Sequence, residues 1–194
     1  MTNTALFAQQ WHQAFTYPPT SGQTEVIKHI SDFITSPRND QIFLLQGYAG
    51  TGKTSVVSSL VNVLKNISMR SVLLAPTGRA AKVISLYSGR RAYTIHRKLY
   101  IQNITDDGRA RFMLTENKHK NTLFIVDEAS MIPDTTSSDG SLFGGRRLLH
   151  DLIEYVYTSE NCKLLLIGDT AQLPPVGIEL SPALNPEYLK NNFN

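Results

Sequence analysis

Cysteine is nearly absent from this sequence of 194 residues, in which Cys162 stands alone. No disulfide can form within the chain, which fits a protein of the reducing cytoplasm. Because Cys162 comes just before an apolar segment and has no histidine close to it in the sequence, we interpret its thiol as structural rather than reactive. We therefore expect a cytoplasmic protein without internal disulfides.

Long apolar runs and a strong excess of one charge are missing as well. No stretch approaches the roughly 20 apolar residues that span a bilayer, so we expect no membrane-spanning helix. Residues 1–7 lack a basic segment followed by a long apolar one, which argues against a signal peptide. The net charge of +3 is only a weak indication of a polyanionic partner.

What the sequence does contain is a regular alternation of short apolar runs and segments with helical periodicity. The apolar runs lie at residues 42–45, 71–75, 122–126 and 163–167, and the helical segments at about 23–34, 53–67, 78–88 and 146–158. Buried strands that alternate with helices predict an α/β fold with a parallel sheet and helices on both faces. Since ligands bind at the carboxyl ends of such strands, the segments after the four runs should form one composite site.

The segment after the first run, residues 47–54, has the sequence of a P-loop. Its glycines let backbone N–H groups approach phosphate oxygens at the start of the next helix. Lys53 should reach the β- and γ-phosphates, and the Thr54 hydroxyl should bind Mg²⁺, so we predict binding of ATP, or a related nucleoside triphosphate, with Mg²⁺. The residues expected to hold the nucleotide in this loop are Gly47, Gly50, Thr51, Gly52, Lys53, Thr54 and Ser55.

Acidic and amide side chains follow the third and fourth runs. Asp127 is placed to hold Mg²⁺, and Glu128 to polarise the attacking water. Gln172 could hydrogen-bond the γ-phosphate or that water. A solvated Asp-Glu pair and a surface glutamine are the plainer alternatives, but the preceding P-loop favours Lys53, Glu128 and Gln172 as catalytic residues.

Two further segments combine the start of a helix with cationic side chains. Residues 76–82 follow the second run, and residues 94–99 supply a hydroxyl, an imidazole and two cations. Backbone N–H groups at such helix starts can bind the phosphates of a nucleic acid. By themselves these segments are more simply explained as capped helices with a solvated face.

Two segments interrupt the alternation of runs and helices. In residues 100–117, an Asp-Gly pair at 107–108 lies between two roughly alternating segments and predicts a β-hairpin. Residues 134–145 are rich in Ser, Thr, Asp and Gly and predict a mobile surface loop.

In their order and approximate spacing, these motifs resemble those of superfamily 1B DNA helicases, and most closely the RecD-like and Dda-like group. The resemblance extends from about Gln23 to Gly177 and rests on the segments GYAGTGKT, APTGRAA, TIHRKL, IVDEASM and LIGDTAQLPPVG. It implies the motor domain of an ATP-dependent 5′–3′ DNA helicase with a P-loop NTPase, RecA-like fold. In this comparison Gln23 contacts adenine and Gln172 senses the γ-phosphate.

The resemblance also implies where DNA binds and how the chain is divided. Residues 1–22 would be an N-terminal extension, residues 23–194 the RecA-like domain 1A, and the hairpin at about 100–117 the small 1B insertion that splits the duplex. Tyr100 and Phe112 are equally well explained as wedge or stacking residues or as the core of the hairpin. Single-stranded DNA would be bound, mainly through its phosphates, by Pro76, Thr77, Arg79, Thr94, His96 and Arg97.

The sequence departs from the family by ending at Asn194, soon after Gly177. A complete family member continues into a second RecA-like domain, which brings a transition-state arginine and the other half of the DNA groove. Arg146 and Arg147 show no family motif that would replace that arginine. We therefore expect a chain that lacks the second domain, binds nucleotide, hydrolyses it poorly and does not unwind DNA alone.

A nucleotide-binding interaction or switch module without helicase activity is the main alternative. The missing second domain favours it for the chain by itself, whereas the motifs after the second and fourth runs favour the helicase. A P-loop kinase would require lid arginines, and an AAA+ ATPase a sensor arginine with a helical lid, and none of these features is recognisable in the sequence.

Overall fold

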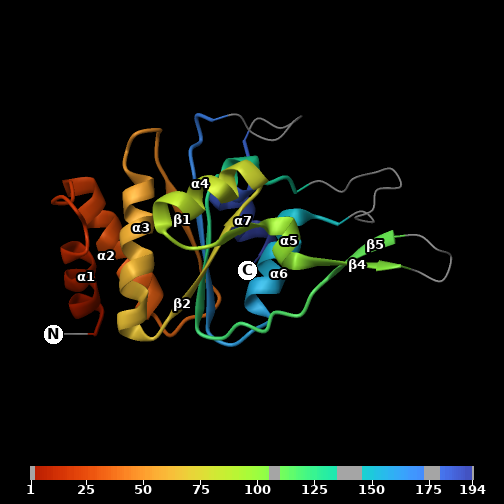
Figure 1. Cartoon of the computed structure of the whole chain (residues 1–194), viewed down its shortest axis with the longest axis horizontal. Coiled ribbons are helices and arrows are strands. Elements are labelled where there is room, and N and C mark those ends of the chain that lie inside the picture. The colour runs from red at the N-terminus through yellow and green to blue at the C-terminus, as the bar shows by residue number, and fades with distance from the viewer. Residues whose placement is uncertain (1–2, 105–109, 135–145, 173–179, 194) are drawn as a thin grey trace.

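The four apolar runs fold as neighbouring strands of one parallel sheet. The computed structural model describes residues 3–104, 110–134, 146–172 and 180–193 (Figure 1). In sheet order the strands are β1 (Ile42–Gln46), β7 (Cys162–Gly168), β6 (Thr122–Val126), β2 (Arg70–Ala75) and β3 (Ala92–Thr94). All pairings are parallel, which confirms the predicted sheet. The edge strand β3 is not predicted, because three residues are too few to give an apolar run.

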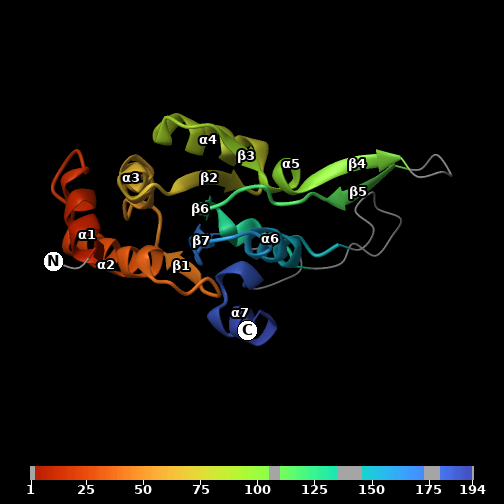
Figure 2. The same ribbon diagram turned by 90° about the horizontal axis from the view of Figure 1, so that it is seen from below.

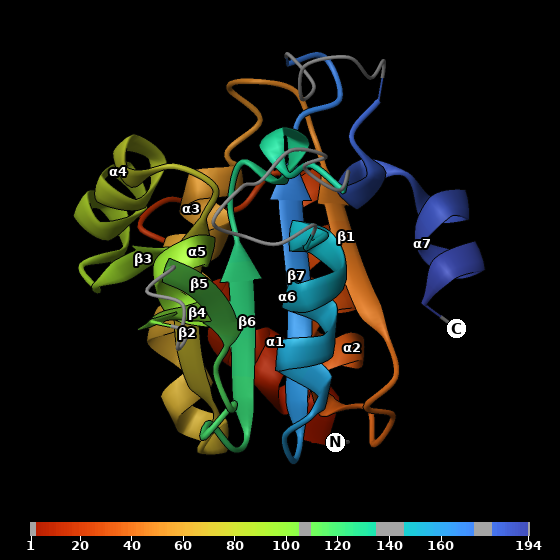
Figure 3. The same ribbon diagram turned by 90° about the vertical axis from the view of Figure 1, so that its right-hand side faces the viewer.

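Alternate residues of the central strands face opposite layers of helices. In β7, Leu164 and Leu166 join one buried cluster, and Leu165 and Ile167 join the other. One layer holds α1 (Asn3–Gln13), α2 (Ser21–Thr35), α3 (Lys53–Val63), the 3-10 helix η1 (Leu64–Ile67) and α4 (Gly78–Ser88), and the other holds α5 (Ile95–Leu99), α6 (Leu148–Tyr157), the 3-10 helix η3 (Pro182–Leu184) and α7 (Pro186–Asn192). Figure 3 shows α6 in front of the sheet and α1 and α2 behind it. Covered faces explain why the strands are continuously apolar.

The N-terminal segment packs into the core rather than standing apart from it. In α1, Phe7 and Trp11 are fully buried in the cluster that contains α2 and α3. The indole Nε1 of Trp11 donates a hydrogen bond of 2.8 Å to the Ser59 hydroxyl on α3. Residues 1–22, expected as an extension, therefore include a helix that packs against α2 and α3.

A β-hairpin projects from the body beyond α5, as Figure 2 shows. Strand β4 (Tyr100–Ile104) pairs antiparallel with β5 (Ala110–Leu114), as predicted, and the Asp-Gly pair itself lies outside the described residues. Tyr100 is buried, and its hydroxyl donates a hydrogen bond of 2.7 Å to Asp151 Oδ2 on α6. Phe112 is half-buried against the same cluster. Tyr100 therefore belongs to the core at the base of the hairpin, whereas Phe112 lies opposite Gln102 in the middle of the two strands.

The predicted surface loop at 134–145 begins at a buried residue. The Asp134 side chain is 0% exposed, and Asp134 Oδ2 accepts hydrogen bonds from Arg147 Nη2 and the Tyr188 hydroxyl, each at 2.5 Å. Asp134 therefore does not belong to a surface loop, because two distant partners hold its carboxylate inside. The other residues of that segment, 135–145, lie outside the described structure.

Among the described helices, none is long and apolar enough to cross a membrane.

Candidate nucleotide-binding site

The carboxyl ends of the parallel strands bring the predicted motifs to one edge of the sheet. In register, Gln46 at the end of β1 pairs with Gly168 at the end of β7, and Val126 of β6 pairs with Leu166 of β7. The loops after these strands lie together at the upper end of the sheet in Figure 3. The backbone N–H of Gly47 donates to the Gly168 carbonyl across 3.2 Å, which ties the first loop to the last. The expected composite edge is therefore present.

The P-loop has a backbone that requires glycine at its turn. Gly50 and Gly52 have φ values of 80° and 86°, in the left-handed region that residues with a Cβ rarely adopt. Gly52 is the N-cap of α3 and supplies no side-chain cap, so backbone N–H groups of the first turn face the loop. Together with the helix dipole, they form a cradle for an anion.

Lys53 lies folded over this cradle. Its ammonium Nζ donates to the carbonyl oxygens of Gly47, at 2.5 Å, and Tyr48, at 2.9 Å. The Thr51 hydroxyl donates to the Tyr48 carbonyl at 2.8 Å. These contacts keep the lysine above the loop, in the position from which it can reach a phosphate.

Gln23 lies beside the P-loop although 29 positions separate it from Gly52. It is the third residue of a capping box on α2: Gln23 Oε1 accepts from the Thr20 N–H at 3.0 Å, and the Thr20 hydroxyl accepts from the Gln23 N–H at 3.3 Å. A Cβ added to Gly52 would lie 2.3 Å from Gln23 Nε2. The capping box therefore holds the amide of Gln23 against the phosphate loop.

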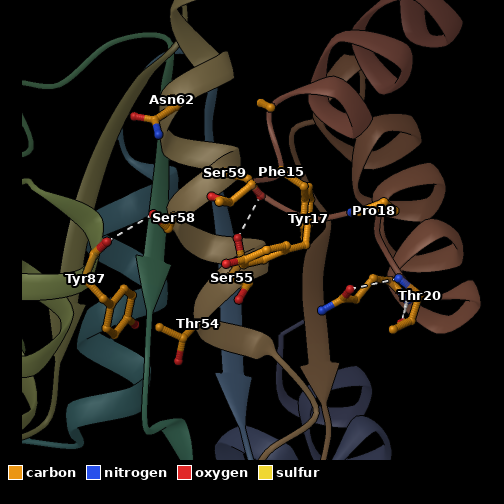
Figure 4. Close-up of a pocket in the computed structure, with 13 residues that line it drawn as sticks. Phe15, Tyr17, Pro18, Thr20, Thr54, Ser55, Ser58, Ser59, Asn62 and Tyr87 are labelled. Carbon is orange, nitrogen blue, oxygen red and sulfur yellow. Dashed lines mark hydrogen bonds between the residues drawn. The ribbon is translucent and has the colours of Figure 1, made fainter.

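A cleft of about 470 Å³ opens between α3, the connection from α1 to α2, and the end of α4 (Figure 4). Thr54 and Ser55, two of the residues predicted to hold the nucleotide, line it from α3. Tyr17 and Gln23 line it from the connection and the start of α2, and Tyr87 from α4. The sequence offers no signal for Tyr17 or Tyr87, because only the tertiary arrangement brings them to the P-loop.

The two carboxylates predicted for metal and water lie together after β6. Asp127 Oδ1 accepts the Glu128 N–H at 2.9 Å, and Asp127 Oδ2 accepts the Tyr87 hydroxyl at 2.6 Å. Both acidic side chains are half-buried. The Thr54 hydroxyl and the Asp127 carboxylate are oxygen donors of the kind that Mg²⁺ prefers, so the residues present fit that ion.

Glu128 is unusual in both its backbone and its electrostatics. It adopts a left-handed conformation, with φ 56° and ψ 38°, directly before the 3-10 helix η2 (Ala129–Met131). Such a conformation costs about 1–3 kcal/mol and is concentrated at functional sites. Burial raises the pKa of Glu128, the Asp127 and Asp169 carboxylates raise it further, and the Lys53 ammonium lowers it. These effects show that the P-loop lysine and the three carboxylates share one electrostatic environment.

Gln172 lies on the loop after β7. Asp169 is buried, and its carboxylate Oδ1 accepts the Ala171 N–H at 2.9 Å, while its carbonyl accepts the Gln172 N–H at 3.2 Å. The Gln172 side chain is exposed. The remainder of the predicted motif, residues 173–177, lies outside the described structure.

The six predicted DNA contacts lie on two adjacent strand ends. Ala75 of β2 pairs with Thr94 of β3, so the starts of α4 and α5 are neighbours. The Thr77 and Thr94 hydroxyls cap these helices, each accepting a backbone N–H at 3.2 Å. The side chains that point to solvent are those of Arg79 and Arg97, while Pro76, Thr77, Thr94 and His96 are half-buried. Both helices are therefore capped, as the plainer interpretation expects. The exposed Arg79 and Arg97 beside the caps can still contact phosphates.

Comparison of the chain with known proteins identifies one matching family and several similar proteins. Residues 30–178 match a family described as an AAA domain. The chain is 32% identical over 136 residues to an ATP-dependent RecD2 DNA helicase of Deinococcus radiodurans, covering 70% of this chain and 16% of that protein. It is 32% identical over 152 residues to the ATP-dependent DNA helicase dda of Enterobacteria phage T4, covering 77% of this chain and 30% of that protein.

An uncharacterized protein of Methanocaldococcus jannaschii is 33% identical over 151 residues, which cover 71% of this chain and 12% of that protein. The chain thus spans less than a third of each of these relatives. The matched family is described only as an AAA domain, whereas two of the relatives are named as ATP-dependent DNA helicases.

Proposed function

Because the chain belongs to the AAA domain family and is a RecD-like, Dda-like motor domain of superfamily 1, we propose that it binds and hydrolyses ATP to drive a DNA helicase. One observation carries the proposal: Lys53, Asp127 and Glu128 meet at the carboxyl edge of the sheet, beside the cleft that Gln23 lines. A phosphate cradle, an oxygen-rich metal site and a half-buried carboxylate together are what phosphoryl transfer to water requires.

The residues divide the chemistry among them. Lys53 exchanges the carbonyls of Gly47 and Tyr48 for the β- and γ-phosphates. Thr54 and Asp127 hold Mg²⁺, which when bound offsets the negative charge of the phosphates. Glu128 accepts a proton from the attacking water, and its raised pKa makes the carboxylate a stronger base than an exposed one.

Gln172 orients the same water or contacts the γ-phosphate, and Gln23 recognises adenine. We propose that single-stranded DNA runs over the starts of α4 and α5, where Arg79 and Arg97 contact its phosphates. Such binding falls steeply with salt and depends little on base sequence. The 5′–3′ direction belongs to this proposal as a property of superfamily 1B.

The matched region covers only 16% and 30% of the two helicase relatives, so a complete motor is proposed for the whole protein rather than for this chain. We propose that a second RecA-like domain supplies the transition-state arginine and closes the DNA groove. Such an arginine contributes about 10³–10⁵-fold to turnover in P-loop NTPases. The present chain by itself should therefore bind ATP well and hydrolyse it slowly.

Titration with a fluorescent ATP analogue, with and without oligothymidine, tests this function. A motor domain binds the analogue in a Mg²⁺-dependent manner, and the oligonucleotide changes its affinity, because the two ligands are coupled. Binding of the analogue that oligothymidine leaves unchanged would favour a nucleotide switch module instead. Absence of analogue binding would refute both.

A further inference from the structure

Tyr87 links helix α4 to the predicted metal site. It is the penultimate residue of α4, and its hydroxyl donates a hydrogen bond of 2.6 Å to Asp127 Oδ2. In Figure 4 the Tyr87 ring enters the cleft opposite Thr54 of α3. The residue therefore contacts the carboxylate assigned to Mg²⁺ from outside the P-loop and outside strand β6.

The backbone that carries this donor is held in place. The Ser58 hydroxyl on α3 donates to the Tyr87 carbonyl at 3.0 Å, which fixes the backbone of α4 at this point. A tyrosine hydroxyl can donate a hydrogen bond and a carboxylate can only accept one, so Tyr87 is the donor and Asp127 the acceptor.

Asp127 is fixed by one partner on each oxygen. The Glu128 N–H binds Oδ1 and Tyr87 binds Oδ2, so the plane of the carboxylate is set before an ion arrives. Each carboxylate oxygen can accept more than one bond, so both retain capacity for Mg²⁺ or its water. Hydrogen-bond partners of this kind orient metal ligands, and their loss costs about 10–100-fold in metal affinity or activity.

The opposite end of α4 lies at the proposed DNA path. Thr77 caps this helix, and Arg79 extends to solvent from its first turn. The helix has 11 residues, or roughly 16 Å at 1.5 Å per residue. Helix α4 therefore carries a predicted DNA contact, Arg79, near its start and the hydrogen-bond donor to Asp127, Tyr87, near its end.

We propose that Tyr87 is a positioning residue for the Mg²⁺ ligand Asp127, and that through it α4 couples the DNA path to the metal site. This inference rests on the proposed function, since it assumes that Asp127 binds Mg²⁺ and that the start of α4 faces DNA. Tyr87 and Ser58 both line the cleft beside the P-loop, so the test has to separate an effect on Mg²⁺ from an effect on the nucleotide.

The test is a Mg²⁺ titration of the Tyr87→Phe variant with a fluorescent ATP analogue. The half-saturating Mg²⁺ concentration should rise about tenfold or more, as expected for loss of a ligand's partner, and this rise should exceed any loss of affinity for the analogue in EDTA. A merely structural role would weaken Mg²⁺ binding and analogue binding by the same factor, and that result would overturn the proposal. Tyr157→Phe is the matched control, because the Tyr157 hydroxyl donates to the Gln41 carbonyl near the start of β1, remote from the cleft.

Two further measurements test whether Tyr87 acts through Asp127 and whether α4 couples the DNA path to the metal site. In an Asp127→Asn background, Tyr87→Phe should add no further loss of Mg²⁺ affinity, because the positioned group is already gone. Oligothymidine should shift the half-saturating Mg²⁺ concentration of the wild type more than that of Tyr87→Phe. Thermal unfolding without ligands verifies that the variants are folded, and additivity with Asp127→Asn would overturn the proposal.

The outcomes separate this inference from the proposed function. If the wild type binds the analogue with Mg²⁺ and Tyr87→Phe has the same Mg²⁺ dependence, the positioning role is refuted and the nucleotide-binding function stands. If the wild type does not bind the analogue, both fail together. If only the effect of oligothymidine is equal in the two proteins, the coupling through α4 is refuted.

Discussion

Replacement of Gly52 by alanine tests the contact between the P-loop and Gln23. Gly52 has φ 86°, where an added Cβ costs about 1–2 kcal/mol. That Cβ would also lie 2.3 Å from Gln23 Nε2, so the glutamine side chain must move. Its movement breaks the hydrogen bond to the Thr20 N–H and removes half of the capping box of α2, at about 0.5–1 kcal/mol.

The two effects together predict that Gly52→Ala lowers the free energy of unfolding by about 1.5–3 kcal/mol. For a chain of this size, each kcal/mol moves the unfolding midpoint by about 2–4 °C, so the midpoint should fall by about 3–12 °C. Differential scanning calorimetry of the ligand-free protein measures this fall. Gly22→Ala is the control, because a Cβ at Gly22 meets nothing within 4 Å and alanine favours the helix.

A double-mutant cycle isolates the contribution of Gln23. Once Gln23→Ala has removed the cap, Gly52→Ala should cost only its backbone strain of about 1–2 kcal/mol. The loss in the double variant should then be smaller than the sum of the single losses by about 0.5–1 kcal/mol. Strict additivity, or a Gly52→Ala midpoint equal to that of the wild type, would refute the proximity of the two residues.

Two other substitutions address the chemistry and the packing. Glu128→Gln should still bind an ATP analogue but should lose at least 100-fold in the rate of hydrolysis, because general bases contribute about 10²–10⁴-fold. A variant with wild-type turnover would exclude Glu128 as the base. Since the base must be ionised and burial raises the pKa of Glu128, wild-type hydrolysis should fall on acidification at a pH above the ordinary glutamate value of 4.5. Arg147→Ala leaves the buried carboxylate of Asp134 with Tyr188 alone. The Arg147 side chain is 36% exposed, so urea unfolding should show a free energy of unfolding lower by about 1–3 kcal/mol, less than the 3–5 kcal/mol of a fully buried pair. An unchanged unfolding curve would show that the ion pair contributes nothing to stability.

The central strands and the phosphate loop could be predicted because their signals are local. Continuous apolar residues mark β6 and β7, since both strands are buried on both faces. The glycines of residues 47–54 mark a backbone that only glycine adopts readily. Order along the chain then places the carboxylates after β6 at the same edge.

Other features depend on contacts between distant residues and leave no local pattern. Tyr87 and Asp127 are 40 positions apart, and their hydrogen bond exists only because α4 ends beside β6. Trp11 is buried in the cluster that α1 shares with α2 and α3, and its indole bonds Ser59, 48 positions away. Asp134 lies in a polar segment typical of a surface loop, yet Tyr188, 54 positions away, holds it inside.

Isothermal titration calorimetry with a non-hydrolysable ATP analogue and Mg²⁺ tests the central claim most directly. The wild type should bind one analogue per chain, and Lys53→Ala should bind it far more weakly because the phosphates lose their cation. Lys65→Ala, which removes an exposed lysine from η1, should bind like the wild type. Absence of binding heat in the wild type, or equal binding by wild type and Lys53→Ala, would contradict the assignment of this edge as a nucleotide site.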